Sequence, residues 1–460
     1  MPLSLTLATA VLLTIIGFSA AFMKARTVGA TGDGRTLHSL PKYHGYLLAL
    51  TILTPCVVVI LLWLALEPVV LDRIILANLP ETLKEASAGR LGLLIGQVRQ
   101  VAAGVTFGEP DPAVFTAAET FQTAANVSRW LLLAVVVAIA LIASGVVVPR
   151  IDLRFRARNT AERIIKYILI FCATISILVT LGILFSLLFE GLRFFAVVSP
   201  LEFFFGINWD PQIAIRPDQV GSTGAFGAVP IFAGTLIIAL TAMVVALPVG
   251  LFSAIYMAEF ASQPVRTVVK PLIEVLAGIP TIVYGFFAVL VVSPAIRGFG
   301  SDIGIPVSPT AAIVPGLVMG VMIIPFISSL ADDAISAVPR TMRDGSLGLG
   351  ATRGETITKV ILPSALPGIV GGVLLATSRA IGETMIVVMA AGLTANLTAN
   401  PLEGVTTVTV QIVALLTGDT SFDSPKTLAA FGLGLTLFLM TLMLNLVAIQ
   451  IVRKYREQYD

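Results

Sequence analysis

The sequence predicts an all-α polytopic membrane protein with about nine transmembrane helices. Of its 460 residues, 57% are hydrophobic and only 12% are charged, whereas soluble domains carry about 25% charged residues. The mean hydropathy is +0.96. A helix needs about 20 apolar residues to cross a bilayer. Stretches of that length cover residues 3–23, 45–66, 129–149, 164–189, 228–254, 269–292, 310–330, 367–392 and 428–452.

The charges between these stretches predict the orientation of the chain. No charged residue precedes the first stretch, and Lys24 and Arg26 follow it, so we interpret it as an uncleaved span whose N-terminus lies outside. Loop 150–163 holds five arginines, whereas 293–309 and 393–427 hold one basic residue each. The positive-inside rule therefore predicts a multi-pass protein with its N-terminus outside and its C-terminus inside.

The spans divide the chain into two predicted domains. Residues 1–163 contain three spans and a long external segment, 67–128, whose apolar residues recur at helical spacing and predict a small helical cap. Residues 164–460 contain the other six spans and the charged motifs. We find no residue pattern in the N-terminal part that predicts a binding or catalytic site.

Several enzyme classes are excluded by missing motifs. The chain has no Gly-Lys dipeptide and so no ATP-binding Walker A motif, and it has neither an H-E-x-x-H nor a G-x-S-x-G motif. Cys56 and Cys172 lie in separate apolar stretches and read as small residues facing the core or lipid, while His38 and His44 read as loop histidines. We therefore expect a non-enzymatic chain without a metal, a cofactor or a nucleic-acid partner.

Two charges interrupt the eighth apolar stretch, in the sequence Arg379-Ala380-Ile381-Gly382-Glu383-Thr384. A charge at the centre of a bilayer costs about 3 kcal/mol and is seldom kept without a use. Arg379 and Glu383 are four residues apart, so we expect them to lie on one face of the helix. We therefore predict that Arg379, Glu383 and Thr384 line a path for a polar or ionic solute. The alternative is an internal ion pair that fixes helix packing.

The inward-facing segment 331–366 predicts two short helices before the eighth span. Pro339 should end the preceding helix, 340–351 should form the first short helix, and 355–362 the second, which Pro363 should stop.

This segment resembles the coupling loop of binding-protein-dependent ABC importer permeases. Their signature is Glu-Ala-Ala, three residues, Gly, nine residues, Ile, one residue and Leu-Pro. The spacing is intact here, but the first triplet differs at all three positions. The matching residues are Asp344, Gly345, Ser346, Gly350, Val360, Leu362 and Pro363. The resemblance implies that they form a coupling helix that docks in a groove of a separate ATPase subunit.

The Arg379 to Thr384 motif is similar to that of phosphate importer permeases, and the residues after it, 385–387, look like their PstC-type subunit. Residues 256–260 and 278–285 also resemble this family. The resemblance spans about 164–460 and implies a six-helix type I ABC importer permease core with residues 1–163 as an extension.

The resemblance implies a function in the bacterial inner membrane. The chain would be the transmembrane permease subunit of an ATP-driven phosphate importer. It would lie in the membrane lipid and form half of the translocation pathway. Its implied partners are a second, PstA-like permease, an ATPase dimer that uses ATP and Mg²⁺, and a periplasmic phosphate-binding protein. The alternatives are a permease for another oxyanion, a secondary transporter, and a membrane sensory or regulatory protein.

The charge pair suggests how phosphate would be selected. The Arg379 guanidinium offers a fork of N–H donors that fits an oxyanion. Phosphate keeps a proton at neutral pH, so its O–H can donate to Glu383, whereas sulfate would face a carboxylate that only accepts. We therefore hypothesise that Glu383 discriminates phosphate from sulfate.

Overall fold

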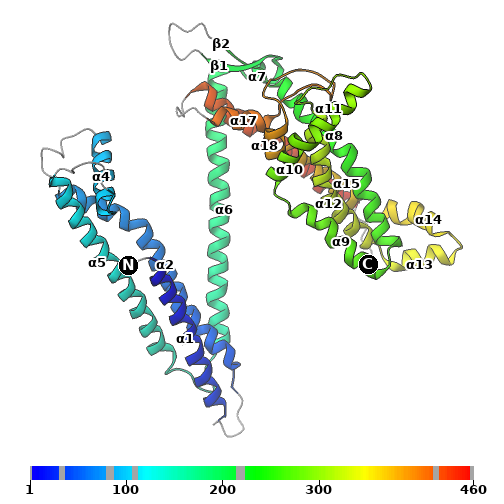
Figure 1. The fold of residues 1–460 in the computed structure, drawn as a ribbon. Coiled ribbons are helices and arrows are strands. Elements are labelled where there is room, and N and C mark those ends of the chain that lie inside the picture. The colour runs from blue at the N-terminus through cyan, green and yellow to red at the C-terminus, as the bar shows by residue number, and fades with distance from the viewer. Residues whose placement is uncertain are drawn as a thin grey trace. The chain divides into compact units, whose positions relative to one another are not determined.

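The computed structural model describes residues 3–30, 37–78, 88–105, 112–213, 223–417 and 424–455. Within these ranges, nine helices are long and apolar enough to cross a membrane, which confirms the predicted fold class. Contacts divide the chain into two compact units, Met1–Leu178 and Val179–Asp460. The boundary falls inside the long helix α6 (Ala157–Val197), C-terminal to the boundary expected between residues 163 and 164 (Figure 1).

Unit 1 is an antiparallel helical assembly built on small and aliphatic residues. Buried Ala21, Leu48, Cys56 and Val136 belong to one apolar cluster. Close packing is possible because glycine faces the neighbouring helix: a Cβ at Gly17 would come within 2.6 Å of the Ile52 side chain. The helices are α1 (Leu3–Ala30), α2 (Pro41–Asn78), α4 (Ala88–Ala102) and α5 (Pro112–Val147).

The segment 67–128, for which a small external helical cap is predicted, contains α4 and the adjoining ends of α2 and α5. Helix α4 packs against the end of α2 and the start of α5, where Ile75, Val98 and Ala117 are buried together. Residues 79–87 and 106–111, which belong to the same prediction, lie outside the described residues.

The prediction for His44 was wrong. It was expected in a loop, but it lies near the start of α2 and is fully buried, with its ring 5.8 Å from that of Phe155. Cys56 is buried in the core, and Cys172 is exposed on the apolar helix α6, as expected of residues that face the core and lipid.

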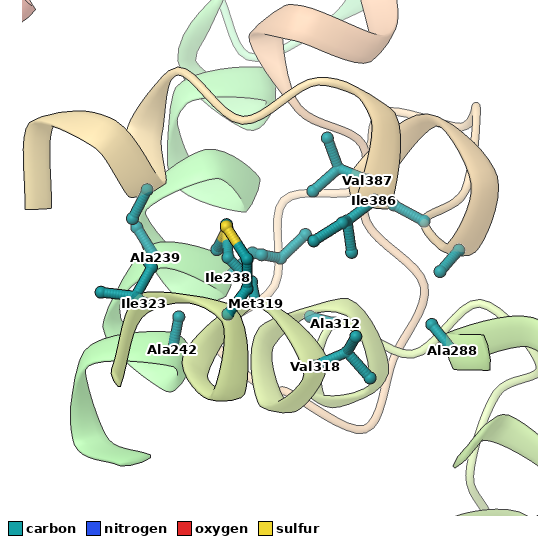
Figure 2. Packing of buried hydrophobic residues seen from close by; sticks show 14 of the residues in the cluster. Ile238, Ala239, Ala242, Ala288, Ala312, Val318, Met319, Ile323, Ile386 and Val387 are labelled. Carbon is teal, nitrogen blue, oxygen red and sulfur yellow. The ribbon is translucent and has the colours of Figure 1, made fainter. Parts of the chain in front are cut away.

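Unit 2 is built around the pair α8 and α12. Small residues let the two helices approach: a Cβ at Gly320 would lie 2.9 Å from the carbonyl oxygen of Ala242. Figure 2 shows Met319 and Ile323 of α12 near Ala242 of α8, with Ile386 and Val387 on the side of Ala312 and Val318 in the same cluster. The elements up to the end of α12 are α7 (Pro200–Phe205), β1 (Trp209–Ile213), β2 (Thr223–Phe226), α8 (Val229–Ile255), η1 (Tyr256–Phe260), α9 (Gln263–Gly278), α10 (Thr281–Phe287), η2 (Ala288–Val292), α11 (Ser293–Asp302) and α12 (Ile313–Ser336).

The second half of unit 2 contains both charged motifs. Three segments of unit 2, η1 and η2 before α12 and η3 after it, are single π-helical turns. The remaining elements are α13 (Arg340–Gly348), α14 (Arg353–Thr356), η3 (Ile357–Ile361), α15 (Leu362–Ile381), α16 (Met385–Ala390), α17 (Val408–Leu416) and α18 (Pro425–Tyr455).

The sixth span is shifted from its predicted position. It was expected at 269–292, but the long apolar helix runs over Thr281–Asp302, and α9 is a separate amphipathic helix. The break lies at Ile279, which has extended backbone angles (φ −71°, ψ 128°). The cause is Pro280, because a proline disfavours helical geometry in the residue before it.

The region around the eighth span corrects two further predictions. The helix expected over 367–392 ends at Ile381, and α16 begins after a short turn. Pro363 does not stop a helix but lies in the first turn of α15, in one helical run over Arg353–Ile381. Just before it, the N–H of Leu362 bonds to the carbonyl of Ile357, five residues back. This π turn shifts the hydrogen-bond pattern ahead of the proline, whose missing N–H is tolerated at a helix start.

Candidate functional site

The predicted pathway residues lie at a break between two helices. Helix α15 ends at Ile381, and Gly382, Glu383 and Thr384 form a turn before the short helix α16. The N–H of Gly382 bonds to the Ser378 carbonyl at 3.2 Å, closing the last turn of α15. Broken helices are tolerated in membrane proteins where they lie against other protein segments or line a cavity.

Glu383 caps α16 with its side chain. Its Oε1 accepts hydrogen bonds from the backbone N–H groups of Met385 (3.1 Å) and Ile386 (3.4 Å). A carboxylate is stabilised there because the first N–H groups of a helix have no partner within it. The backbone carbonyl of Glu383 accepts a bond from the buried hydroxyl of Thr409 at 2.9 Å, so both parts of the residue are positioned.

Arg379 lies in the last turn of α15 and its side chain contacts α12. Its Cζ lies 5.6 Å from the centroid of the Phe326 ring, and its Nη2 lies 3.9 Å from the Met322 Sδ. Within the described residues, no carboxylate oxygen lies within 4.0 Å of this guanidinium. Nη2 is thus used by Met322, whereas Nε and Nη1 make no hydrogen bond among the described residues and can donate to a ligand.

The expectation that Arg379 and Glu383 share a helical face was wrong. The helix ends between them, so the four-residue spacing no longer places their side chains together. Thr384 lies at the N-terminal end of α16, and its hydroxyl donates to the Gly382 carbonyl at 3.3 Å. The structure therefore groups Glu383 and Thr384 at the turn and holds Arg379 separately, on exposed surface of α15.

The motif at 278–285 packs against the same break. Gly285 of α10 lies against α16, where a Cβ would come within 3.0 Å of the Met389 side chain. The Tyr284 hydroxyl donates to the Leu276 carbonyl at 2.8 Å and ties the end of α9 to α10. These two sequence motifs are far apart in the chain, and the structure brings them together.

The predicted coupling residues lie at the other end of α15. Asp344, Gly345 and Ser346 belong to α13, Val360 lies in η3, and Leu362 and Pro363 begin α15. Asp344 and Gly345 are exposed, whereas Leu362 packs into an apolar cluster with Ile335 and Ile357. One helix thus connects the coupling loop to the Arg379 turn.

The backbone of one glycine and two sets of side-chain hydrogen bonds define the shape of the coupling loop. Gly350 has a φ of +91°, a conformation that glycine adopts without a steric cost, so the motif glycine fits its backbone. The Ser346 hydroxyl lies 3.0 Å from that of Thr356 and links α13 to α14. Thr352 and Glu355 form a capping box at the start of α14. The loop is therefore a defined helical hairpin (Figure 1).

Sequence reasoning missed the apolar tip of this loop. Leu349 is 92% exposed and Leu347 is half exposed. The side chain of Leu349 buries almost none of its surface in the described chain, so it leaves apolar surface at the tip of the loop. The signal was available, because both leucines alternate with the glycines Gly348 and Gly350 in a loop otherwise rich in charged residues.

Sequence reasoning also missed three ion pairs near the coupling loop. The carboxylate of Asp332 on α12 is fully buried and lies 2.9 Å from both Arg266 and Lys270 on α9. The hydrogen bond between Lys270 and the Asp332 carboxylate raises the pKa of Lys270. Glu259 of η1 lies 3.0 Å from Arg343 of α13. The partners in each pair are more than 60 residues apart, so no local spacing predicts them.

Comparisons with known proteins place the chain among transport proteins. Residues 7–179 match the family "Phosphate ATP-binding cassette transporter", and residues 246–457 match "Binding-protein-dependent transport system inner membrane component". The probable ABC transporter permease protein YqgH of Bacillus subtilis is 36% identical over 278 residues, which cover 60% of this chain and 86% of that protein. The chain belongs to the PstC-type family of ABC transporter permeases.

The chain is also similar to another curated permease and to solved transporter structures. The phosphate transport system permease protein PstC 1 of Mycobacterium tuberculosis is 31% identical over 283 residues, covering 56% of this chain and 83% of that protein. Among solved structures, the inward-facing MetNI methionine ABC transporter matches with a TM-score of 0.37 and 18% identity, covering 50% and 95% of the two chains. Members of the PstC-type family are multi-pass inner-membrane subunits of ATP-driven importers, so this chain is a permease subunit and ATP hydrolysis belongs to a separate subunit.

Proposed function

We propose that this permease imports phosphate and that Arg379, Glu383 and Thr384 line its half of the pathway. The observation that carries the proposal is that Arg379 has no anionic partner among the described residues. Its guanidinium is exposed, stacked on Phe326 and without a carboxylate partner in the described part of the chain. An unpaired cation on a membrane subunit is costly unless it serves an anionic solute or faces water. The printed names of the relatives point to phosphate as that solute.

The arrangement suits weak binding of a protonated oxyanion. Arg379 would donate to two oxygens of phosphate. Glu383 uses Oε1 to cap α16, and no hydrogen bond to its Oε2 occurs among the described residues, so that oxygen is available to accept from the phosphate O–H. The exposure of Arg379 in the single chain is consistent with a path completed by the second permease. A transport site must bind its solute weakly enough to release it.

The proposed complex contains a PstA-like second permease, an ATPase dimer that uses ATP and Mg²⁺, and a periplasmic phosphate-binding protein. With the N-terminus outside and the C-terminus inside, the hairpin of α13 and α14 faces the cytoplasm. Exposed Leu347 and Leu349 would then enter a groove of the ATPase, a common way for an apolar helix face to recognise a partner.

The test is uptake by the assembled complex in proteoliposomes. Radiolabelled phosphate and radiolabelled sulfate are supplied in turn with the binding protein outside and ATP inside. We expect ATP-dependent uptake of phosphate and little uptake of sulfate. Uptake of sulfate in preference to phosphate would favour the second candidate, a permease for another oxyanion. Phosphate uptake without ATP would instead indicate a secondary transporter.

A further inference from the structure

The coupling helix α13 is attached to the rest of unit 2 by few contacts. None of its nine residues is buried. Met342 is half-buried against the cluster that contains Ile335 and Ile357, and Ser346 bonds to Thr356 in the neighbouring helix. A helix without a buried face can transmit a movement only through the side chains that contact the membrane helices. These contacts therefore decide how closely the membrane helices follow a movement of α13.

Arg343 makes polar contacts from α13 to two membrane helices. Its Nη2 lies 3.0 Å from the Glu259 Oε1 in η1, the π turn that continues α8. The same Nη2 donates to the Ile335 carbonyl near the end of α12 at 2.8 Å. The side chains of Arg343 and Glu259 are only 22% and 11% exposed. Glu259 Oε1 accepts no hydrogen bond from the described residues, so the two groups are joined by charge alone. Water screens a half-buried pair of charges poorly, so the attraction between them persists at physiological ionic strength.

The two helices that Arg343 contacts also contribute to the surroundings of the proposed pathway. Helices α8 and α12 pack together along their length. Two residues of α12, Met322 and Phe326, hold the guanidinium of Arg379. A displacement of α13 that pulls on Ile335 therefore acts on the same helix that positions Arg379.

We infer that the Glu259–Arg343 pair is a positioning contact that transmits the movement of α13 to α8 and α12. It keeps ATP hydrolysis and solute movement coupled, and this inference rests on the proposed function. Without the pair, α13 still docks on the ATPase through its exposed face, but its movement is no longer passed fully to the membrane helices. ATP is then hydrolysed with less phosphate moved.

The experiment measures phosphate imported per ATP hydrolysed by the complete complex in proteoliposomes. We expect Glu259→Gln and Arg343→Gln each to lower this ratio by about fivefold, the lower end of typical coupling between two sites. The exchange of the two charges, Glu259→Arg with Arg343→Glu, should restore at least half of the wild-type ratio. A purely structural role would lower assembly and activity together and leave the ratio unchanged.

Asp332→Asn is the matched control. Asp332 forms buried ion pairs of the same kind near the same end of α12, but its partners Arg266 and Lys270 belong to α9 rather than α13. We expect this variant to lower the melting temperature of the complex and to leave phosphate per ATP at the wild-type value.

Three results would overturn the inference. The first is an unchanged ratio in the assembled Glu259→Gln and Arg343→Gln complexes. The second is an equal fall of the ratio in Asp332→Asn. The third concerns the case in which the single variants fail to assemble. If the charge-exchanged variant then restores neither assembly nor the phosphate-to-ATP ratio, the inference is wrong. If the wild-type complex moves sulfate instead, the proposed function fails, and the same ratio measured with sulfate still decides the inference.

Discussion

The guanidinium of Arg379 lies over the ring of Phe326, with 5.6 Å between Cζ and the ring centroid. The arginine belongs to the last turn of α15 and the phenylalanine to α12, so the contact fixes the cation between two packed helices. The ring and the Met322 Sδ, which Nη2 contacts, position the guanidinium. The N–H groups of Nε and Nη1 have no partner in the described part of the chain and remain for an anion.

Replacement of Arg379 tests the need for these N–H groups. In Arg379→Lys the charge remains, but the planar fork and the stacking are lost. We expect the KM for phosphate uptake to rise about tenfold, which corresponds to about 1.4 kcal/mol. In Arg379→Gln the charge is also lost, and ATP-dependent uptake should fall below detection while the complex still assembles. Wild-type uptake by Arg379→Gln would show that the cation is not needed.

Replacement of Glu383 tests the selection of phosphate. In Glu383→Gln the amide oxygen can still cap α16, but the amide presents N–H groups where the carboxylate only accepted. Because a hydrogen bond to a charged group contributes about 1.5–3 kcal/mol, we expect the preference for phosphate over sulfate to fall at least about tenfold. The measurement is competition between the two labelled anions.

The control for this substitution is Glu274→Gln on the exposed surface of α9, which should keep the wild-type preference. An unchanged preference in Glu383→Gln would remove Glu383 from selectivity.

The exposed tip of the coupling loop gives a prediction about assembly. Leu349→Asp places a charge where a 92% exposed leucine is proposed to enter an apolar groove. We expect the ATPase to be lost on co-purification, since burying an unpaired charge is strongly unfavourable. Leu40→Asp is the control, because Leu40 is also an exposed leucine outside the helices, at 66% exposure. Equal loss of the ATPase in both variants would contradict specific docking.

The backbone of Gly350 gives a prediction about stability. At φ +91° an alanine is strained, although no atom lies within 4 Å of its added Cβ. Gly350→Ala should therefore lower the free energy of unfolding of the loop by about 1–2 kcal/mol. Gly345→Ala has the same open surroundings but helical geometry, so it should stabilise α13 by about 0.5–1 kcal/mol. Hydrogen exchange of the loop amides measures both, and equal protection in the two variants would refute the argument.

The fold was largely predictable because bilayer thickness sets the length of an apolar helix. The number of spans follows from this. Four of the nine predicted positions lie wholly within the helices observed, and three more extend past a helix end by one to three residues. The predicted bounds of the sixth and eighth spans were wrong for local reasons. Apolar residues lie on both sides of Pro280 and of Gly382, so the mean hydropathy of a window does not reveal a helix break that a single residue causes.

The residue types of the site were predictable, but their arrangement was not. Arg379 and Glu383 stand out by charge in an apolar stretch. A basic residue in a last helical turn, then Gly382 and Thr384, is also the composition of one helix ending and another beginning, and this signal was overlooked. The contacts of Arg379 with Phe326 and of Glu259 with Arg343 join distant segments, and only the fold reveals them.

The most direct test of the pathway uses a thiol at position 384. Thr384→Cys is made in a chain with Cys56 and Cys172 replaced, and the assembled complex is treated with a membrane-impermeant, negatively charged thiol reagent. The account predicts that the thiol reacts and that phosphate slows the reaction several-fold, whereas sulfate does not. A thiol that never reacts, or reacts equally fast with phosphate present, would contradict the claim that this turn lines the path of the anion.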